Sequence, residues 1–494
     1  MTTTSEPEIK ISEESARSGE TGNRAAAPPN PSQLEGRQGQ GSKFEAPIVL
    51  AVGVAFFLGV AFAKSPLNGF SRLTGWEWPW RNDIELLRSI AFLLVPFALI
   101  DFVLRKAEGR PPTHAWIYVG ILTAGNFLMQ AMALLAEPEG FGLLQRIVQS
   151  PVATSYFTDA ERIAGLAAWL RHFDQASLAF HSSTHPPGPV LFYFVFLKLF
   201  GAPLGSLIGG CVVGALGSLG VAVAYAFAGL WTDDKRAKLT VCALYALLPA
   251  LTLFFPEFDQ VYPILSMLLI LFWCRALQSE RKISWEAFGL GVILFTAVFF
   301  AYNLLSIGAF LAYYAIYWMW RQGWSGASFA KMAKNSGIAG GVCGGAYALL
   351  WLGAGYNPIG AFRHALAYQK VYASLLHRDY WNFMLCDPYD FLLGAGMMAL
   401  PLLAFYLYRA IRNLDGGKEE IALSLIGLTT ILTVDLTGVL RGEAARVWLF
   451  LQPLLIVPAA LELARFRGRW RTALFSMQWL ILACLKAKML FIGP

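Results

Sequence analysis

The chain has 494 residues, of which 56% are hydrophobic and only 14% are charged, and its net charge is +7. Soluble globular domains carry about 25% charged residues, so this composition excludes an ordinary soluble domain and indicates a membrane protein. Most of the positive charge falls in short loops between apolar runs, which is typical of orientation signals and not of a nucleic-acid-binding surface. The six cysteines show no Cys-x-x-Cys spacing, so the sequence indicates neither a structural metal site nor a disulfide framework.

Residues 1–45 are rich in Ser, Glu, Gly, Pro and Gln and contain almost no large apolar side chains. Such a segment cannot offset the entropy that ordering removes, so we expect a disordered cytoplasmic tail. It is too long and too polar for the start of a signal peptide, and the first apolar run is expected to remain as a membrane anchor. Residues 46–494 are expected to form the transmembrane domain.

Apolar runs of about 16–28 residues recur along the rest of the chain, and each is long enough to cross a hydrocarbon core of about 30 Å. We therefore predict an all-α polytopic membrane protein with about 13 transmembrane helices. The predicted spans are 46–63, 84–104, 115–136, 204–231, 239–255, 261–277, 286–301, 304–320, 337–354, 391–409, 421–439, 448–464 and 472–491.

The loops that carry Lys and Arg all fall on one side of this arrangement, which predicts a cytoplasmic N-terminus and an outer C-terminus. These loops lie around residues 105–110, 235–238, 281–282, 321–334, 409–418 and 465–471. Residues 189–200 are apolar but would reach only about 18 Å as a helix. We expect them to lie in the outer interface, with Lys198 extending to the headgroups.

Four polar stretches are thereby placed outside: two long external loops, 137–203 and 355–390, and two short segments, 256–263 and 441–446. The first loop contains Ser-Tyr-Phe-Thr-Asp-Ala-Glu, residues 155–161, ahead of a helical pattern. As a structural residue, Thr158 or Asp159 would cap that helix. As a functional residue, Asp159 would act as a general base on an acceptor hydroxyl at the membrane surface.

His181 and His185 flank a Ser-Ser-Thr segment, and Pro-Pro-Gly-Pro follows directly. Two histidines four residues apart can bind a metal from one helix face, but prolines here argue against a regular helix. His185 is better explained as orienting the turn or contacting a phosphate. A divalent metal stays open, and no cofactor is required by the sequence.

An acidic motif in the first large external loop, followed by His-Pro-Pro and a short apolar helix ending in Phe200-Gly201, resembles the GT-C fold. Protein O-mannosyltransferases and lipid A aminoarabinose transferases have this fold. The resemblance implies a membrane enzyme that takes a sugar from a polyprenyl-phosphate donor on the extracytoplasmic face. It also implies interfacial helices in the first external loop, and a catalytic acid at Asp159, with Glu161 as the alternate.

The resemblance covers about residues 115–300, and two features depart from the family pattern. Three spans precede the first large loop where the family usually has one, and the family's paired Asp-Glu is separated into Asp159 and Glu161. In the family, the position of Glu257 and Asp259 is a second acidic site near the donor and occasionally a metal ligand. A solvated loop tip explains these two residues as well.

Arg441, Glu443 and Arg446 stand in the last external segment. Guanidinium groups bind phosphate bidentately, so Arg441 and Arg446 are candidates for the donor phosphate. A network of Arg and Glu that joins two helix ends is the structural alternative. The loop 355–390 has mixed charges and aromatic side chains, and its residues 361–376 also fit a plain amphipathic interfacial helix.

Together these features favour a glycosyltransferase of the plasma (inner) membrane that transfers a sugar to a lipid, glycan or protein acceptor. The alternative is a multi-span transporter or flippase for a lipid or polar solute. Transporters concentrate polar residues and broken helices near the midplane, whereas most polar groups here gather at one surface. That distribution favours surface chemistry over passage.

Overall fold

The computed structural model describes residues 42–62, 74, 78–109, 113–281, 284–412 and 418–492. Among these residues the protein is all-helical, with only one isolated β-bridge, between Trp80 and Met489. The predicted disordered tail lies outside the described residues up to position 41, and the first helix begins at Ser42. The functional groups discussed below all belong to the unit Phe44–Pro494.

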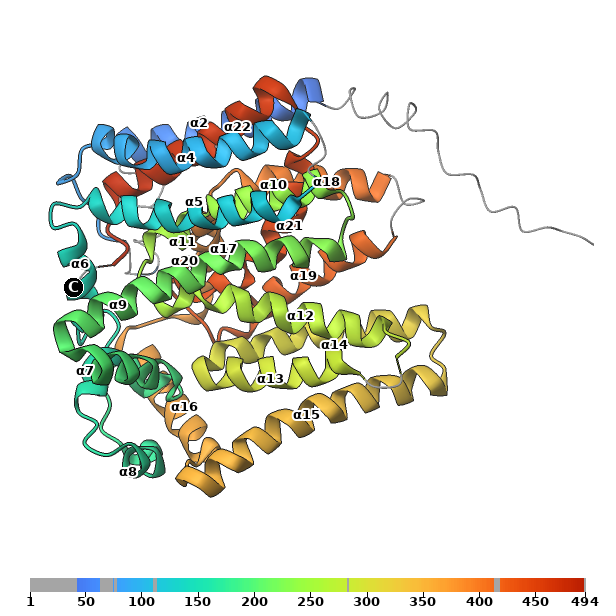
Figure 1. The fold of residues 1–494 in the computed structure, drawn as a ribbon. Coiled ribbons are helices and arrows are strands. Elements are labelled where there is room, and N and C mark those ends of the chain that lie inside the picture. The colour runs from blue at the N-terminus through green and yellow to red at the C-terminus, as the bar shows by residue number, and fades with distance from the viewer. Residues whose placement is uncertain are drawn as a thin grey trace, which may run out of the picture. The chain divides into compact units, whose positions relative to one another are not determined.

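The longer helices run roughly alongside one another (Figure 1). The α-helices are α2 (Ser42–Phe62), α4 (Leu86–Gly109), α5 (Ala115–Leu135), α6 (Phe141–Gln149), α7 (Tyr156–Glu161), α8 (Leu166–Arg171), α9 (Gly188–Phe227), α10 (Lys235–Ala246), α11 (Pro249–Leu253), α12 (Tyr262–Gln278), α13 (Trp285–Phe300), α14 (Gly308–Arg321), α15 (Gly326–Ala354), α16 (Pro358–Leu375), α17 (Tyr380–Ala395), α18 (Ala399–Arg412), α19 (Lys418–Thr437), α20 (Ala444–Val447), α21 (Gln452–Leu463) and α22 (Gly468–Lys488). The 3-10 helices are η1 (Phe173–Gln175), η2 (Ser182–Thr184), η3 (Ala228–Leu230), η4 (Phe258–Gln260), η5 (Tyr302–Ile307) and η6 (Leu449–Leu451).

Several helices begin at polar residues whose side chains accept a hydrogen bond from the first turn. Asp234, Ser284, Ser325, Asn357 and Asp379 cap α10, α13, α15, α16 and α17 in this way. Each cap satisfies a backbone N–H that has no partner inside the helix. These residues therefore mark helix starts that the hydrophobic pattern alone leaves undefined.

Seven of the described helices are long and apolar enough to cross a membrane, and the number rises to eight if α17 and α18 form one bent span. The seven are Phe44–Phe62, Leu86–Glu108, Ala115–Leu135, Gly188–Leu230, Phe258–Gln278, Gly326–Ala354 and Glu419–Thr437. This composition is compatible with a membrane-embedded protein. Each of the thirteen predicted ranges contains helix, but thirteen crossings are not established.

Helix α9 is two limbs joined at a sharp turn, because Gly201 leaves the helical region with φ 73° and ψ 174°. A Cβ on Gly205 would lie 2.7 Å from the carbonyl oxygen of Phe196, and one on Gly209 would lie 2.9 Å from the ring of Tyr193. In a straight helix, residues 196 and 205 would be about 13 Å apart along the axis. The first limb therefore folds back on the second. Residues 189–200 are therefore helical and set apart from the following span, as predicted, while their position in the outer interface stays a prediction.

The predicted loop 355–390 is mostly helical, because α16 and the first part of α17 occupy it. Helix α17 ends at Ala395, and the next residue, Gly396, has φ 83°. The axes of α17 and α18 differ in direction by 98°. The predicted span 391–409 is therefore not one straight helix. Glycine accommodates the positive φ that this break requires.

Candidate active site at the loop-rich end of the helices

Segments far apart in the sequence meet where α7, η2, η4 and α20 lie. Helix α7 packs against α9, η2 against α16, η4 against η6, and α20 against α17. Most of the candidate residues chosen from the sequence lie on these segments or next to them. The structure thus gathers the 137–203, 256–263, 355–390 and 441–446 segments at one end of the helical unit.

Arg446 is the centre of the charged cluster at this end. Its Nη2 lies 2.5 Å from Oε2 of Glu443, and its Nη1 lies 3.4 Å from Oε1 of Glu257. Glu443 also pairs with Arg378, at 2.8 Å. The side chains of Arg446 and Glu257 are only 12% and 4% exposed, so these ion pairs are screened far less than pairs on an open surface.

The turn that carries Glu443 and Arg446 is held by two buried aspartates of α17. Gly442 donates its backbone N–H to the carboxylate of Asp387, at 3.1 Å and 3.2 Å. Asp390 accepts the N–H of Ala445 at 2.9 Å through one oxygen, and the indole N–H of Trp78 at 2.7 Å through the other.

These contacts stabilise an uncommon backbone conformation. Gly442 has φ 79° and Glu443 has φ 56°, and the second value is unfavourable for a residue with a side chain. Asp387 and Asp390 therefore fix the direction in which Glu443 and Arg446 project.

Arg441 is placed differently from Arg446. Its Nη1 donates to the carbonyl oxygen of Arg378 at 2.7 Å, and Arg378 Nη1 donates back to the carbonyl oxygen of Arg441 at 2.5 Å. The guanidinium of Arg441 also lies 5.8 Å from the ring centroid of Tyr380. Of the two arginines predicted to bind phosphate, only Arg446 belongs to the Glu257–Glu443 ion-pair network.

His181 and His185 lie next to this network. His181 is within electrostatic reach of Arg446 and Glu443, and the ring of His185 makes an edge contact with Tyr156 at 5.6 Å. Burial, with a further contribution from Arg446, lowers the pKa of His181 to about 3. Burial also lowers the pKa of His185 to about 4. Both imidazoles are therefore neutral at neutral pH and offer hydrogen bonds without positive charge.

The segment between the two histidines is a short 3-10 helix, Ser182–Thr184, in place of a longer α-helix. Nδ1 of His185 lies 2.8 Å from the carbonyl oxygen of His181 and 3.1 Å from Oγ1 of Thr184. His185 therefore orients this turn, as the sequence indicated. Among the described residues, no group of three or more His, Cys, Asp and Glu side chains is placed to hold a metal ion.

Asp159 is buried within α7 and is only 1% exposed. Its Oδ1 accepts from Nη1 of Arg162 at 3.1 Å, and its Oδ2 accepts the backbone N–H of Ala179 at 2.9 Å. Each carboxylate oxygen has a second lone pair, so these bonds leave proton-accepting capacity. Asp159 thus connects α7 to the loop that leads to His181. Glu161, in contrast, is exposed.

The prediction that Thr158 or Asp159 caps this helix is wrong. Helix α7 begins at Tyr156, and its N-cap position is Ser155, whose side chain makes no capping bond. The hydroxyl of Ser155 instead accepts the backbone N–H of Ser182 at 3.0 Å. Thr158 donates to the carbonyl oxygen of Gln149 at 3.2 Å. Tertiary contacts therefore occupy the side chains that local sequence rules assigned to capping.

The pKa values of Glu257 and Glu443 are shifted in opposite directions, although both residues lie next to Arg446. Burial raises the pKa of Glu257 to about 8, in spite of the opposing charge of Arg446. Burial would also raise the pKa of Glu443, but Arg446 and Arg378 outweigh it and hold that pKa below its ordinary value. At neutral pH, Glu443 is thus the ionised partner and Glu257 is mostly protonated. Asp259 is partly exposed beside them.

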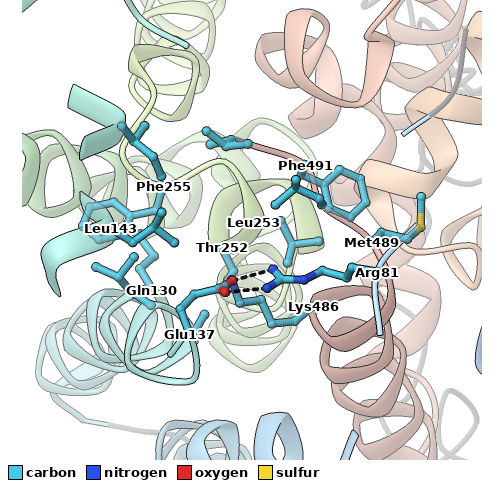
Figure 2. A pocket seen from close by; sticks show the side chains of 15 residues that line it. Arg81, Gln130, Glu137, Leu143, Thr252, Leu253, Phe255, Lys486, Met489 and Phe491 are labelled. Carbon is cyan, nitrogen blue, oxygen red and sulfur yellow. Dashed lines mark hydrogen bonds and ion pairs between the residues drawn. The ribbon is translucent and has the colours of Figure 1, made fainter. Parts of the chain in front are cut away.

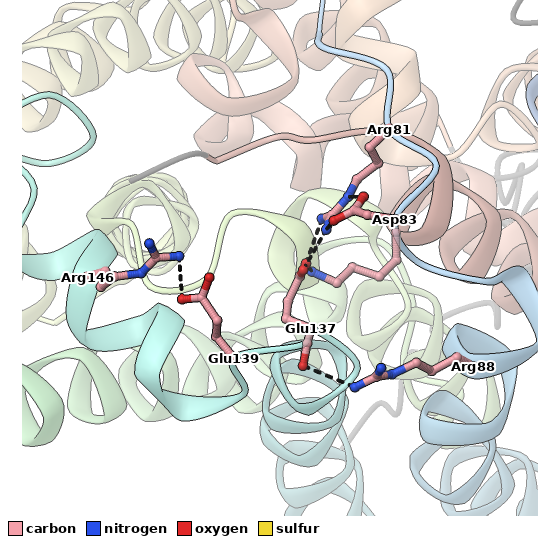
Figure 3. A network of polar contacts seen from close by, with 7 residues as sticks. Arg81, Asp83, Arg88, Glu137, Glu139 and Arg146 are labelled. Atoms are coloured by element: carbon pink, nitrogen blue, oxygen red, sulfur yellow. Dashed lines mark hydrogen bonds and ion pairs between the residues drawn. The ribbon is translucent and has the colours of Figure 1, made fainter.

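A second polar assembly lies at the same end, around Glu137. Arg81 donates to both oxygens of Glu137, at 2.8 Å and 2.7 Å, and Lys486 pairs with the same carboxylate. Figure 3 shows Arg81 between Glu137 and Asp83, with Arg88 directed at the backbone carbonyl oxygen of Glu137. The side chain of Glu137 is only 4% exposed, so its ion pairs with Arg81 and Lys486 are largely shielded from solvent.

A narrow cavity of about 30 Å³ adjoins this assembly. Figure 2 shows Arg81, Glu137 and Thr252 around it, with Phe255 at its edge. The hydroxyl of Thr252 is buried and has no hydrogen-bond partner among the described residues. A cavity of this size has room for a water molecule, but not for a sugar. Phe255 lies two residues from Glu257, so the cavity and the Arg446 cluster share one segment.

Sequence reasoning missed several residues of the site. Arg378 was noted only as part of the loop 355–390. The bonds of Asp387 and Asp390 to the 441–446 turn, and that of Trp78 to Asp390, were not foreseen. The Asp-Pro-Tyr-Asp spacing puts both aspartates on one helix face, and that spacing was the available signal. Nothing in the sequence indicates that this face meets a turn 55 residues away.

The chain matches no protein-family model and no curated protein. The fold and the site therefore define a class only: an all-helical protein, compatible with the membrane, with a buried cluster of acids and arginines at one end.

Proposed function

We propose that the protein is a membrane glycosyltransferase of the GT-C type, which moves a sugar from a polyprenyl-phosphate donor to an acceptor. The observation that carries the proposal is the buried Arg446 cluster, where Glu257, Glu443 and Arg378 converge beside two histidines. A transfer of this kind needs a carboxylate near a group that offsets phosphate charge. The cluster supplies the cation, and the adjacent helix α7, whose Tyr156 is within electrostatic reach of Arg446, carries the proposed carboxylate.

In the proposed reaction the acceptor hydroxyl oxygen forms a bond to the anomeric carbon of the sugar. The bond from that carbon to the phosphate oxygen breaks, and the polyprenyl phosphate leaves with the bonding electron pair. A carboxylate accepts the hydroxyl proton. Asp159 is the proposed base, with Glu161 as the alternate, and Arg446 offsets the charge that develops on the departing phosphate.

The other candidate residues surround this reaction. Glu257 is mostly protonated at neutral pH and leaves the positive charge of Arg446 less neutralised for phosphate. His181 and His185 are proposed to donate or accept hydrogen bonds to the substrate. Asp259 is proposed to contact the donor, and Arg441 to bind phosphate from the rim.

The membrane arrangement is part of the same proposal. In this proposal the chain crosses the plasma (inner) membrane thirteen times. Its N-terminus is cytoplasmic, and the active site lies on the extracytoplasmic face. The acceptor is a lipid, a glycan or a protein. The 137–203 segment contributes the helices that lie in the outer interface.

The test is a screen of the purified protein against polyprenyl-phosphate sugars, with release of the lipid phosphate as the readout. We expect Asp159→Asn to lower turnover by at least about a hundredfold, the usual scale of general-base catalysis. The variant should still fold, because its amide oxygen can accept the N–H of Ala179. Glu139→Gln is the matched control, since Glu139 lies in the same loop and is 48% exposed.

The companion variants Glu257→Gln and Asp259→Asn separate the two carboxylate sites. If Asp159→Asn keeps full turnover while one of these loses it, the base has been assigned to the wrong residue. If no polyprenyl-phosphate sugar is cleaved by a folded preparation, the glycosyltransferase proposal fails.

One observation favours a transporter or flippase as the second candidate. Helix α9 folds back at Gly201, and α17 and α18 meet at 98°, and broken helices are typical of transporters. Uptake of a solute or lipid by proteoliposomes, without cleavage of any bond, would support this alternative.

A further inference from the structure

A large cavity lies at the opposite end of the helices from Arg446. It measures about 570 Å³ and lies between the last turns of α12 and α14 and the first turns of α15 and α19. Helix α12 joins the two ends, because η4 and Glu257 precede it and Gln278 lines the cavity at its last residue. Small-molecule sites commonly measure about 300–1,000 Å³, so this cavity can hold a polar headgroup.

Two cations line the cavity, Arg321 and Lys331. Among the described residues Arg321 has no carboxylate partner, and its Nη1 meets only the hydroxyl of Tyr317, at 3.3 Å. Lys331 pairs with Glu280 at 3.1 Å, but Glu280 is 94% exposed. Such a solvated pair contributes little to stability, so an incoming anion can replace Glu280.

Two acidic residues, Glu280 and Glu419, also line the cavity, and Glu419 is held by a neutral residue of its wall. Glu419 accepts a hydrogen bond from the side-chain amide of Gln278 at 2.8 Å. Lys331 Nζ also lies 5.6 Å from the ring of Trp318, which keeps the ammonium at the aromatic wall. Glu419 thus forms no ion pair with Arg321 or Lys331 among the described residues, which leaves both cations able to bind an anionic ligand.

The surroundings of the cavity fit the level of lipid headgroups. Trp285, Trp320 and Trp324 are 63%, 61% and 59% exposed and lie at the same end, and exposed tryptophans are typical of membrane interfaces. Helix α15, which contributes Lys331, has only 6% of its apolar window buried. Gly337 and Gly341 on α15 have nothing within 4 Å of an added Cβ, so this surface is open to acyl chains.

We propose that the phosphate of an anionic phospholipid binds between Arg321 and Lys331, with its acyl chains along the open surface of α15. The guanidinium of Arg321 takes the phosphate oxygens, and Lys331 exchanges its contact with Glu280 for the phosphate. This lipid is neither the donor nor the acceptor, because its site lies a helix length from the Arg446 cluster. The inference therefore stands apart from the proposed glycosyl transfer.

The test is native mass spectrometry of the purified full chain, released from nanodiscs that contain equal amounts of phosphatidylglycerol and phosphatidylcholine. The wild type should retain phosphatidylglycerol in preference. Because a cation near a membrane surface contributes a factor of roughly five in affinity, Arg321→Gln and Lys331→Gln should each lower retention about fivefold. The double variant should lower it about 25-fold.

The matched control is the double variant Lys235→Gln/Arg236→Gln. It removes the same charge at the same end, where α10 begins, but neither residue lines the cavity. Equal retention by this control and by the Arg321/Lys331 variant would overturn the proposal. Arg321→Lys keeps the charge without the planar guanidinium, and it should restore part of the retention if the larger change disturbs folding.

Inorganic phosphate distinguishes the two sources of the same chemical group. If millimolar inorganic phosphate binds the wild type and displaces no phosphatidylglycerol, or if neither lipid is preferred, the site is not a phospholipid site. Preference for phosphatidylglycerol that the Arg321/Lys331 variant loses and the control keeps would support it.

Discussion

At Arg446, two glutamates share one guanidinium but hold different protonation states. Glu257 is deeply buried and contacts Arg446 only through one oxygen at 3.4 Å. Glu443 lies at 2.5 Å and has Arg378 as a second cation. Desolvation therefore dominates at Glu257 and charge pairing dominates at Glu443. When their surroundings shift the pKa values of two neighbouring carboxyl groups in opposite directions, one group can act as an acid and the other as a base.

The pH dependence of stability should reveal Glu257. Its pKa is about 8 in the folded protein, against an ordinary value of 4.5. Between these values the folded state holds a proton that the unfolded chain has lost, so its contribution to stability is complete below 4.5 and falls as pH rises toward 8. We expect Glu257→Gln to flatten the loss of thermal stability between about pH 5 and about pH 8, by on the order of 2–4 kcal/mol.

The measurement is the difference in melting temperature between the variant and the wild type across that range. A difference is needed because His181 and His185 act in the opposite sense. Their lowered pKa values make stability fall as pH drops below about 6.5. An identical pH profile for the two proteins would show that Glu257 is already ionised at neutral pH.

Most residues of the Arg446 cluster could be chosen from the sequence, because polar side chains are rare in this chain and stand in short motifs. Glu257, Glu443 and Arg446 were selected in that way. Arg378 could not be ranked above its neighbours, because it lies among several charged residues of one segment. Trp78 donates a hydrogen bond to Asp390, which is 312 residues away in the sequence. No local sequence pattern indicates a contact between residues so far apart.

At the level of the helices, the close contact between the two limbs of α9 depends on glycine. An added Cβ on Gly205 would meet backbone atoms of Phe196, which cannot rotate away. We expect Gly205→Ala to lower stability by about 1–3 kcal/mol, the usual cost of overpacking. Gly337→Ala on α15 is the control, because its Cβ would meet nothing within 4 Å and alanine favours a helix.

Thermal unfolding in detergent measures both variants. The fold-back is supported if Gly205→Ala melts at a lower temperature while Gly337→Ala does not. Equal melting temperatures for both would mean that the two limbs are not in close contact.

The hydrophobic pattern predicted where the helices lie but not how they bend. Every predicted range contains helix, since runs of apolar residues are a strong and local signal. The short length of 189–200 predicted a helix separate from the following span, but not that it folds back on that span at Gly201. The break at Gly396 was not, because a glycine in an apolar run reads equally well as part of a helix.

Across the whole molecule, the assembly around Glu137 joins distant parts of the chain. Arg81 precedes α4, Glu137 follows α5, and Lys486 belongs to the last turn of α22. Burial would raise the pKa of Glu137, but Arg81 and Lys486 outweigh it and hold the pKa below its ordinary value. The carboxylate is therefore ionised and compensates two cations that are themselves 11% and 13% exposed.

Removing this carboxylate should be costly. Glu137→Gln leaves Arg81 and Lys486 without their shared partner, and we expect a loss of about 3–5 kcal/mol, as for other broken buried pairs. Asp83→Asn is the control, because Asp83 is 57% exposed and its pair with Arg81 contributes about 1 kcal/mol or less. The melting temperatures of the two variants decide the matter, and similar values would show that the assembly contributes no special stability.

Glu137 and Lys486 are 349 residues apart, and this separation has a consequence for biosynthesis. At about 5–20 residues per second, a ribosome needs roughly 20–70 s to make the intervening chain. During that interval Arg81, which is made earlier, is the cation available to the nascent carboxylate. We therefore expect Arg81 to pair with Glu137 while later helices are being inserted, and Lys486 to join the assembly last.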